Sequence, residues 1–190
     1  GQTLFGFVSE STNQAMWSIT GNAALMKKTY VPKYIFTLSK VTSSFVNTVF
    51  SLGAMIIVFV ICKIKPNTNM LFIPVILFQM YIFCTGLGMI LAQGTVFFRD
   101  IQYIYSAVLT AWMYLTPIFY PIQQLPLSLQ KIIKHFNPLY SYITQFRIIV
   151  LEGAFPDPRL ILYGFAVAFA VLIVGTIVFF KNQDKFILYI

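Results

Sequence analysis

The chain has 190 residues, of which 58% are hydrophobic and only 9% are charged, and its mean hydropathy is +0.80. A soluble chain of this length needs more polar surface than these residues provide, so the composition excludes an ordinary soluble enzyme and favours a membrane-embedded bundle. The formal net charge is +8. The basic residues lie at the ends of apolar runs, where they meet lipid headgroups, so nucleic acid is not an expected partner.

The first twenty residues lack the basic segment and clean apolar core of a secretory signal. They are typical of the C-terminal part of a membrane span. We therefore expect an N-terminal part of the protein to precede Gly1. Glu10 is the one carboxylate near the middle of an expected span. A proton-coupled carrier would place more ionisable groups there, so the energy for transport is expected to come from another subunit.

A polar stretch over residues 21–40 follows. Residues 23–26 favour a helix, and Pro32 would end it. A span is expected over residues 36–62, with a polar first half that should face protein or water. The next, over 70–98, contains no charged residue. In it Gly88 and Ala92 permit a close helix approach, either within the chain or between two copies.

Arg99 and Asp100 separate this span from the next and form either an ion pair or a helix start. We expect an aromatic-rich span over 101–122, ended by prolines. Residues 125–151 contain two short amphipathic segments broken at Asn137-Pro138, which predicts a re-entrant or interfacial hairpin. A clean span over 160–180 and a short basic tail close the chain.

Sites for chemistry are scarce. No phosphate-binding glycine loop of the P-loop type occurs, the single histidine, His135, lies on a polar helix face, and the five acidic residues are scattered. Cys62 and Cys84 lie in apolar runs and are expected to be buried thiols. The sequence therefore predicts no catalytic centre, metal site or cofactor within this chain.

Orientation rests on a narrow difference in positive charge. Alternating spans would place seven basic residues on one side and six on the other. The cluster over residues 27–40 favours a cytoplasmic location for that loop. The seven are Lys27, Lys28, Lys33, Lys40, Arg99, Lys181 and Lys185, and the six are Lys63, Lys65, Lys131, Lys134, Arg147 and Arg159.

Several modest motifs occur in a fixed order along nearly the whole chain. They are Asn22-x-x-Leu25-x-Lys27-Lys28-x-x-x-Pro32, Phe98-Arg99-Asp100-Ile101, Thr116-Pro117-Ile118-Phe119-Tyr120-Pro121, Leu125-Pro126, Asn137-Pro138-Leu139-Tyr140 and Phe146-Arg147. This order resembles the membrane (permease) subunit of type-2 ABC transporters, in the branch that exports O-antigen, teichoic acid and capsule-like polysaccharides.

The resemblance implies an all-α, polytopic transmembrane helix bundle in the bacterial cytoplasmic membrane. Permeases of this family have six spans, pair with a second copy, and work with a separate ABC ATPase that binds ATP and Mg²⁺. The expected substrate is a lipid-linked glycan, and membrane lipids surround the bundle. On this comparison residues 1–190 form a single permease domain that lacks the N-terminal helix, the first span and part of the second.

The resemblance also implies roles for particular residues. Residues 21–33 match a cytoplasmic coupling helix that contacts the ATPase, residues 99–100 a cytoplasmic turn, and residues 125–151 an external gate. The coupling residues are Asn22, Leu25, Lys27, Lys28 and Pro32, the turn residues Arg99 and Asp100, the path residues Trp112, Tyr114, Phe119 and Tyr120, and the gate residues Lys131, Lys134, Asn137, Pro138, Tyr140 and Arg147. Membrane anchoring is the alternative for Lys27, Lys28 and Tyr120.

Other functions remain open from the sequence. A type-2 ABC permease for drugs, antibiotics or lipids would share most of these motifs. An integral-membrane acyl- or glycosyltransferase would need an intramembrane histidine or acidic site, which this chain scarcely offers. A passive channel or a structural membrane subunit is a further alternative.

Overall fold

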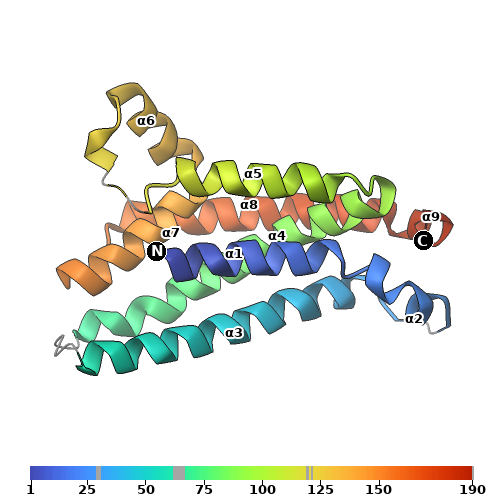
Figure 1. The fold of residues 1–190 in the computed structure, drawn as a ribbon, viewed down its shortest axis with the longest axis horizontal. Coiled ribbons are helices and arrows are strands. Elements are labelled where there is room, and N and C mark those ends of the chain that lie inside the picture. Colours follow the sequence, from blue (N-terminus) through green and yellow to red (C-terminus); the bar gives the residue numbers. More distant parts are fainter. Residues whose placement is uncertain (29–30, 62–66, 119, 121, 190) are drawn as a thin grey trace.

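The computed structural model describes residues 1–28, 31–61, 67–118, 120 and 122–189, and this part of the chain is helical without strands (Figure 1). The all-α prediction is therefore confirmed. The calls on Cys62, Lys63, Lys65 and Phe119 lie outside the described residues. The long helices are α1 (Gln2–Met16), α3 (Tyr34–Ile61), α4 (Ile73–Phe97), α5 (Ile101–Leu115) and α8 (Pro158–Asn182), and the short ones are α2 (Ala23–Lys28), α6 (Leu127–Phe136), α7 (Pro138–Arg147) and α9 (Phe186–Tyr189).

Helix α4 forms the centre of the bundle, because it packs against α1, α3 and α8 and is mostly buried. Helix α8 is similarly apolar but keeps most of its surface exposed. Among the described residues, Thr68–Phe97 and Pro158–Lys185 are long and apolar enough to cross a membrane. The polytopic arrangement of the other helices stays a prediction.

Small residues of α4 allow two neighbouring helices to approach closely. A Cβ at Gly86 would lie 2.5 Å from the backbone of Leu172, and one at Gly175 would overlap the Gly86 carbonyl, so α4 and α8 touch through their backbones. A Cβ at Gly88 would lie 2.9 Å from Cβ of Ala15 on α1. Of the two alternatives for Gly88, packing within the chain is therefore the one that the structure supports.

Helix α5 ends earlier than predicted. The sequence suggested a span over 101–122, whereas the helix stops at Leu115 and Thr116 is extended, with ψ of 124°. Pro117 explains the correction, since a proline disfavours helical backbone in the residue before it.

The hairpin region contains two short helices that break at Asn137. The side chain of Asn137 accepts a hydrogen bond from the N–H of Leu139 at 3.1 Å and so caps the start of α7. Helix α7 runs on into a π-turn, Ile148–Glu152, which ends at Gly153 with φ of 65°. Only a residue tolerant of the left-handed region fits there readily.

The two ends of the bundle carry different elements (Figure 1). We call one the coupling end, with α2, the α4–α5 turn (residues 98–100) and α9. We call the other the hairpin end, with α6 and α7. This segregation places the predicted coupling residues and the predicted gate residues at opposite ends of the molecule.

Candidate functional site

Helix α2 at the coupling end is fixed to the bundle through its N-terminal side. The amide of Asn22 donates to the carbonyl of Ser18 at 2.7 Å, and the Ser18 hydroxyl lies 2.9 Å from that of Thr37 on α3. The remaining predicted coupling residues face outward: Leu25 is 49% exposed, and Lys27, Lys28 and Pro32 are also exposed. Helix α2 is anchored at its start and exposes apolar and cationic side chains, so its surface is suited to contact another protein.

The C-terminal tail folds back onto this end. The ammonium of Lys33 donates to the carbonyl of Gln183 and lies 5.8 Å from the centroid of the Phe186 ring. Phe186 is fully buried and packs with Phe179 and Ile19. The sequence indicated a short basic tail with an apolar end, but it contained no periodic signal that identifies the partners of Phe186.

The α4–α5 turn begins a helix rather than forming an ion pair. The carbonyl of Asp100 accepts hydrogen bonds from the N–H groups of Tyr103 and Ile104 at 3.0 and 3.3 Å. Among the described residues, Arg99 and Asp100 are not joined by an ion pair, and Asp100 makes no side-chain cap. Of the two alternatives for Asp100, the structure supports the helix start.

Two hollows adjoin Trp17 at the coupling end, and this aromatic residue is 52% exposed. One, of about 440 Å³, is lined by Asn13, Gln14, Trp17, Gly21, Asn22 and Lys40. The other, of about 300 Å³, lies toward α5 and is lined by Trp17, Thr20, Ala23, Thr95, Arg99, Gln102 and Tyr189. Sequence reasoning left Trp17 without a function, since nothing in its local pattern distinguishes it from an interfacial anchor.

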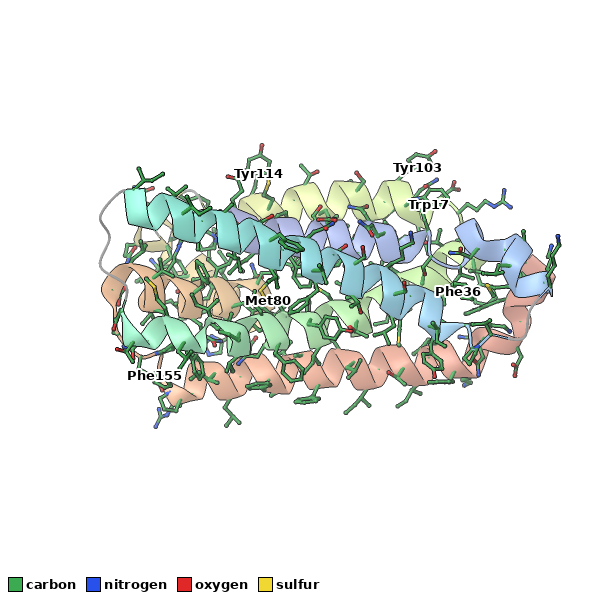
Figure 2. The ribbon with its side chains drawn as sticks, turned by 90° about the horizontal axis from the view of Figure 1, so that it is seen from below. Trp17, Phe36, Met80, Tyr103, Tyr114 and Phe155 are labelled. Atoms are coloured by element: carbon green, nitrogen blue, oxygen red, sulfur yellow. The ribbon has the colours of Figure 1, made fainter. Side chains whose placement is uncertain are left out.

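One face of α5 carries hydroxyl groups along its length. They recur at helical spacing and are exposed on Tyr103, Ser106, Thr110 and Tyr114. Figure 2 shows Tyr103 and Tyr114 pointing away from the bundle on the same side, where they are 70% and 66% exposed. The predicted path residue Tyr114 therefore belongs to an open hydroxyl-bearing face, which we call the α5 face.

The other described path residues hold structure together. The indole N–H of Trp112 donates to Oδ1 of Asn137 at 2.9 Å, and the ring of Trp112 packs edge-on against Phe83. The hydroxyl of Tyr120 donates to the carbonyl of Tyr114 at 2.7 Å. The three described path residues are thus not equivalent, and of these three only Tyr114 belongs to the α5 face.

The predicted gate residues divide into two groups. Asn137, Pro138 and Arg147 build the hairpin: Pro138 begins α7, and the guanidinium of Arg147 donates to the carbonyl of Ile118 at 2.6 Å. Lys131 and Lys134 are exposed on α6, and Tyr140 is partly buried. Of the three cations, Arg147 is therefore engaged in the structure of the hairpin, whereas Lys131 and Lys134 share the exposed surface of α6.

A buried polar network holds α7 against α4 and α8. The amide of Gln145 donates to Oε1 of Gln79 at 3.3 Å, to Oγ of Ser141 at 3.2 Å and to the carbonyl of Leu160 at 3.3 Å. The hydroxyl of Tyr142 donates to the carbonyl of Gly164 at 3.0 Å. The sequence signal for it was the glutamine within an uncharged span, since a polar group there must find an internal partner.

Glu10 lies between α1 and α3 in a second polar group. Its carboxylate accepts hydrogen bonds from the amides of Gln14 at 3.0 Å and Asn47 at 2.9 Å. Over the described ranges, no three histidine, cysteine, aspartate or glutamate side chains come together in a geometry that could hold a metal ion. The polar groups described so far are suited to hydrogen bonding and to holding helices together.

Comparison with known proteins decides the family. Residues 3–151 match the family described as ABC-2 type transporter. The chain belongs to this family of membrane transport proteins. As an ABC-2 permease it is similar to the O-antigen export system permease protein RfbA of Myxococcus xanthus, with 27% identity over 94% of this chain and 69% of the relative. Two RfbA proteins of Klebsiella pneumoniae are 29% and 26% identical, each over 95% of this chain and 69% of the relative.

The family assigns the bundle to a membrane, which agrees with its composition. The segment that matches runs from α1 through the hairpin and contains α2, the α5 face and the two hollows, apart from Tyr189. Helix α2, the α5 face and both hairpin helices therefore lie in the segment that matches the family, whereas α8 and the C-terminal tail lie beyond it.

Proposed function

We propose that this ABC-2 permease is the membrane subunit of an ATP-driven exporter for a lipid-linked polysaccharide. The proposal is supported by likeness over about 95% of the chain to permeases named for O-antigen export. Teichoic acid and capsule-like polymers share the same lipid-linked chemistry and belong to the same substrate class. The sequence has no phosphate-binding loop, so ATP and Mg²⁺ would be bound by a separate ATPase subunit.

The α5 face is the observation that carries a glycan path. Tyrosine rings pack on the C–H faces of sugars, and hydroxyl groups exchange hydrogen bonds with sugar hydroxyls. Such contacts are weak and repeated, so a long polymer can slide past them. A face with four hydroxyl side chains is costly against lipid but well suited to a polar path, which a second copy of the permease would close.

Helix α2 would transmit the work of the ATPase. ATP closes the ATPase dimer, the motion passes to α2, and the bundle shifts through the contacts of Asn22 and Ser18 with α1 and α3. The exposed side chains of Lys27 and Lys28 would meet ATPase carboxylates or anionic lipid. In this orientation the coupling end lies in the cytoplasm. The permease would cross the membrane several times.

The hairpin would then lie at the external mouth. Its base is fixed by Asn137 and Arg147, while Lys131 and Lys134 are exposed on α6 and could meet a pyrophosphate-linked carrier or an anionic polymer. Changing both lysines to glutamine should reduce export of an anionic polymer and spare a neutral one. Unchanged export of an anionic polymer would remove the lysines from the gate.

The deciding experiment depletes the permease in its host and measures cytoplasmic polyprenyl-linked glycans by mass spectrometry. Accumulation of finished, lipid-linked polymer with loss of the surface glycan is the expected result, and it identifies the cargo. An intact surface glycan without accumulation would contradict the proposal and favour export of a drug or lipid.

A further inference from the structure

The smaller hollow at the coupling end has the dimensions and position of a ligand site. Its volume of about 300 Å³ lies at the lower end of the range for small-molecule sites, about 300–1,000 Å³. Its walls come from segments far apart in the chain: the end of α1, the start of α5 and the C-terminal α9. Gln102 lines it directly beside Tyr103, the first residue of the α5 face.

Two polar groups of this hollow have no partner within the described part of the chain. The Arg99 guanidinium makes neither a hydrogen bond nor an ion pair there, although Asp100 is its neighbour in sequence. The hydroxyl oxygen of Thr20 is buried and makes no hydrogen bond. Buried polar groups are normally paired, so an unpaired hydroxyl and an exposed, unpaired guanidinium among the lining residues of one hollow favour a polar ligand there. A guanidinium binds phosphate through two parallel hydrogen bonds.

The remaining walls suit a sugar. Trp17 and Tyr189 are 52% and 56% exposed, and an exposed aromatic ring offers a platform for the C–H face of a pyranose. The amide of Gln102 can both donate to and accept from sugar hydroxyls. The hollow with Lys40 shares Trp17 but contains no unpaired buried hydroxyl, which is why the assignment falls on the hollow with Arg99.

We propose that this hollow binds the sugar–phosphate head of the lipid-linked glycan before the glycan enters the α5 face. Arg99 would bind the phosphate, Gln102 would pair with oxygen atoms of the head, and Trp17 would stack on the first sugar. The inference rests on the proposed function and adds a receiving site to it. An anionic phospholipid carries the same phosphate without the sugar, so the test must separate these two sources.

The test uses the complete permease with its ATPase in the host membrane. A photoreactive benzoyl-phenylalanine replaces Gln102, and ultraviolet light should produce a permease adduct that carries glycan and is lost in cells unable to start polymer synthesis. Arg99→Gln should reduce the adduct about tenfold or more, since it removes charge-assisted hydrogen bonds to phosphate, and Arg99→Lys should restore part of it. Trp17→Ala should also reduce the adduct, and Trp17→Phe should retain it.

Matched controls lie at the same end. Lys181→Gln removes one exposed positive charge, and Phe98→Ala removes an exposed ring beside Arg99, yet neither residue lines the hollow. Both should leave the adduct and the export rate unchanged, and copurified ATPase should be equal in all variants.

Each contrary result has its own meaning. An adduct that persists without polymer synthesis would overturn the proposal in favour of a phospholipid headgroup. If depletion of the permease accumulates lipid-linked glycan but position 102 yields no adduct, or Arg99→Gln changes neither adduct nor export, the receiving site is wrong and the exporter function stands. If depletion accumulates no such glycan, both proposals fail together.

Discussion

The indole N–H of Trp112 and the side-chain oxygen of Asn137 form a 2.9 Å hydrogen bond between the last turn of α5 and the break in the hairpin. The same Asn137 oxygen accepts from the N–H of Leu139, and its amide donates to the Thr116 hydroxyl at 2.9 Å. One buried side chain therefore caps α7 and joins it to the end of α5. Movement of α5 would be transmitted to the hairpin through this residue.

Asn137→Ala should destabilise the permease by about 2–4 kcal/mol. The change removes a helix cap, worth about 1 kcal/mol, and leaves the Trp112 indole N–H without its acceptor, which costs a further 1–3 kcal/mol when buried. Denaturant unfolding of the purified permease in detergent, followed by circular dichroism, measures the change. Gln123→Ala, at an exposed residue of the same region, is the matched control. Equal stability of the two variants would show that the Asn137 contacts do not contribute to the free energy of unfolding.

Much of the bundle could be predicted because apolar runs specify helices wherever the chain is in lipid. Helices α4 and α8 follow directly from their uncharged stretches, and α2 from a short helix-favouring run before Pro32. The early end of α5 was also in the sequence, at Pro117, but the aromatic run beyond it looked continuous with the span. The bond from Trp112 to Asn137 could not be predicted, since it joins residues 25 positions apart.

In the candidate site, too, local features could be predicted from the sequence and tertiary contacts could not. Lys27, Lys28 and Tyr114 are all exposed, as the local pattern predicts, while the coupling and path roles expected of them stay predictions. The hollow beside Trp17 needs α1, α5 and α9 to meet, and no spacing along the chain encodes that meeting. The exposure of single residues could therefore be predicted from the local sequence. The grouping of residues by tertiary packing could not.

Two glycine-to-alanine changes should have opposite effects on stability. Gly86→Ala places a methyl group 2.5 Å from the Leu172 backbone, and separating α4 from α8 should cost about 1–3 kcal/mol. Gly53 lies on the exposed side of α3 with open space around it, so Gly53→Ala should be neutral or stabilise by up to about 1 kcal/mol through helix propensity. Thermal unfolding in one detergent compares them directly. A Gly86→Ala protein as stable as wild type would mean that α4 and α8 are not in backbone contact.

The Gln79–Gln145 pair should behave as a coupled unit. Gln79→Leu or Gln145→Leu alone removes one member of a buried hydrogen-bonded pair, at a cost of about 1–3 kcal/mol. The double variant replaces both by apolar groups of similar size, so its cost should be smaller than the sum of the two by about 0.5–3 kcal/mol. A double-mutant cycle of unfolding free energies measures this difference. Strict additivity would indicate that the two amides do not interact.

Reversal of charge on α2 should separate ATP hydrolysis from export. Lys27→Glu combined with Lys28→Glu places two carboxylates on the exposed surface expected to meet the ATPase. Contacts between like charges across an interface cost several kcal/mol. Both side chains are exposed and lie outside the packed core, so the fold is expected to persist. Lys181→Glu with Lys185→Glu makes the same change in charge at the same end, at exposed residues that are not part of α2. Surface glycan should fall in the first double variant and not in the second, while ATP hydrolysis by the purified complexes persists in both. Wild-type export with Lys27 and Lys28 reversed would show that α2 is not the coupling element.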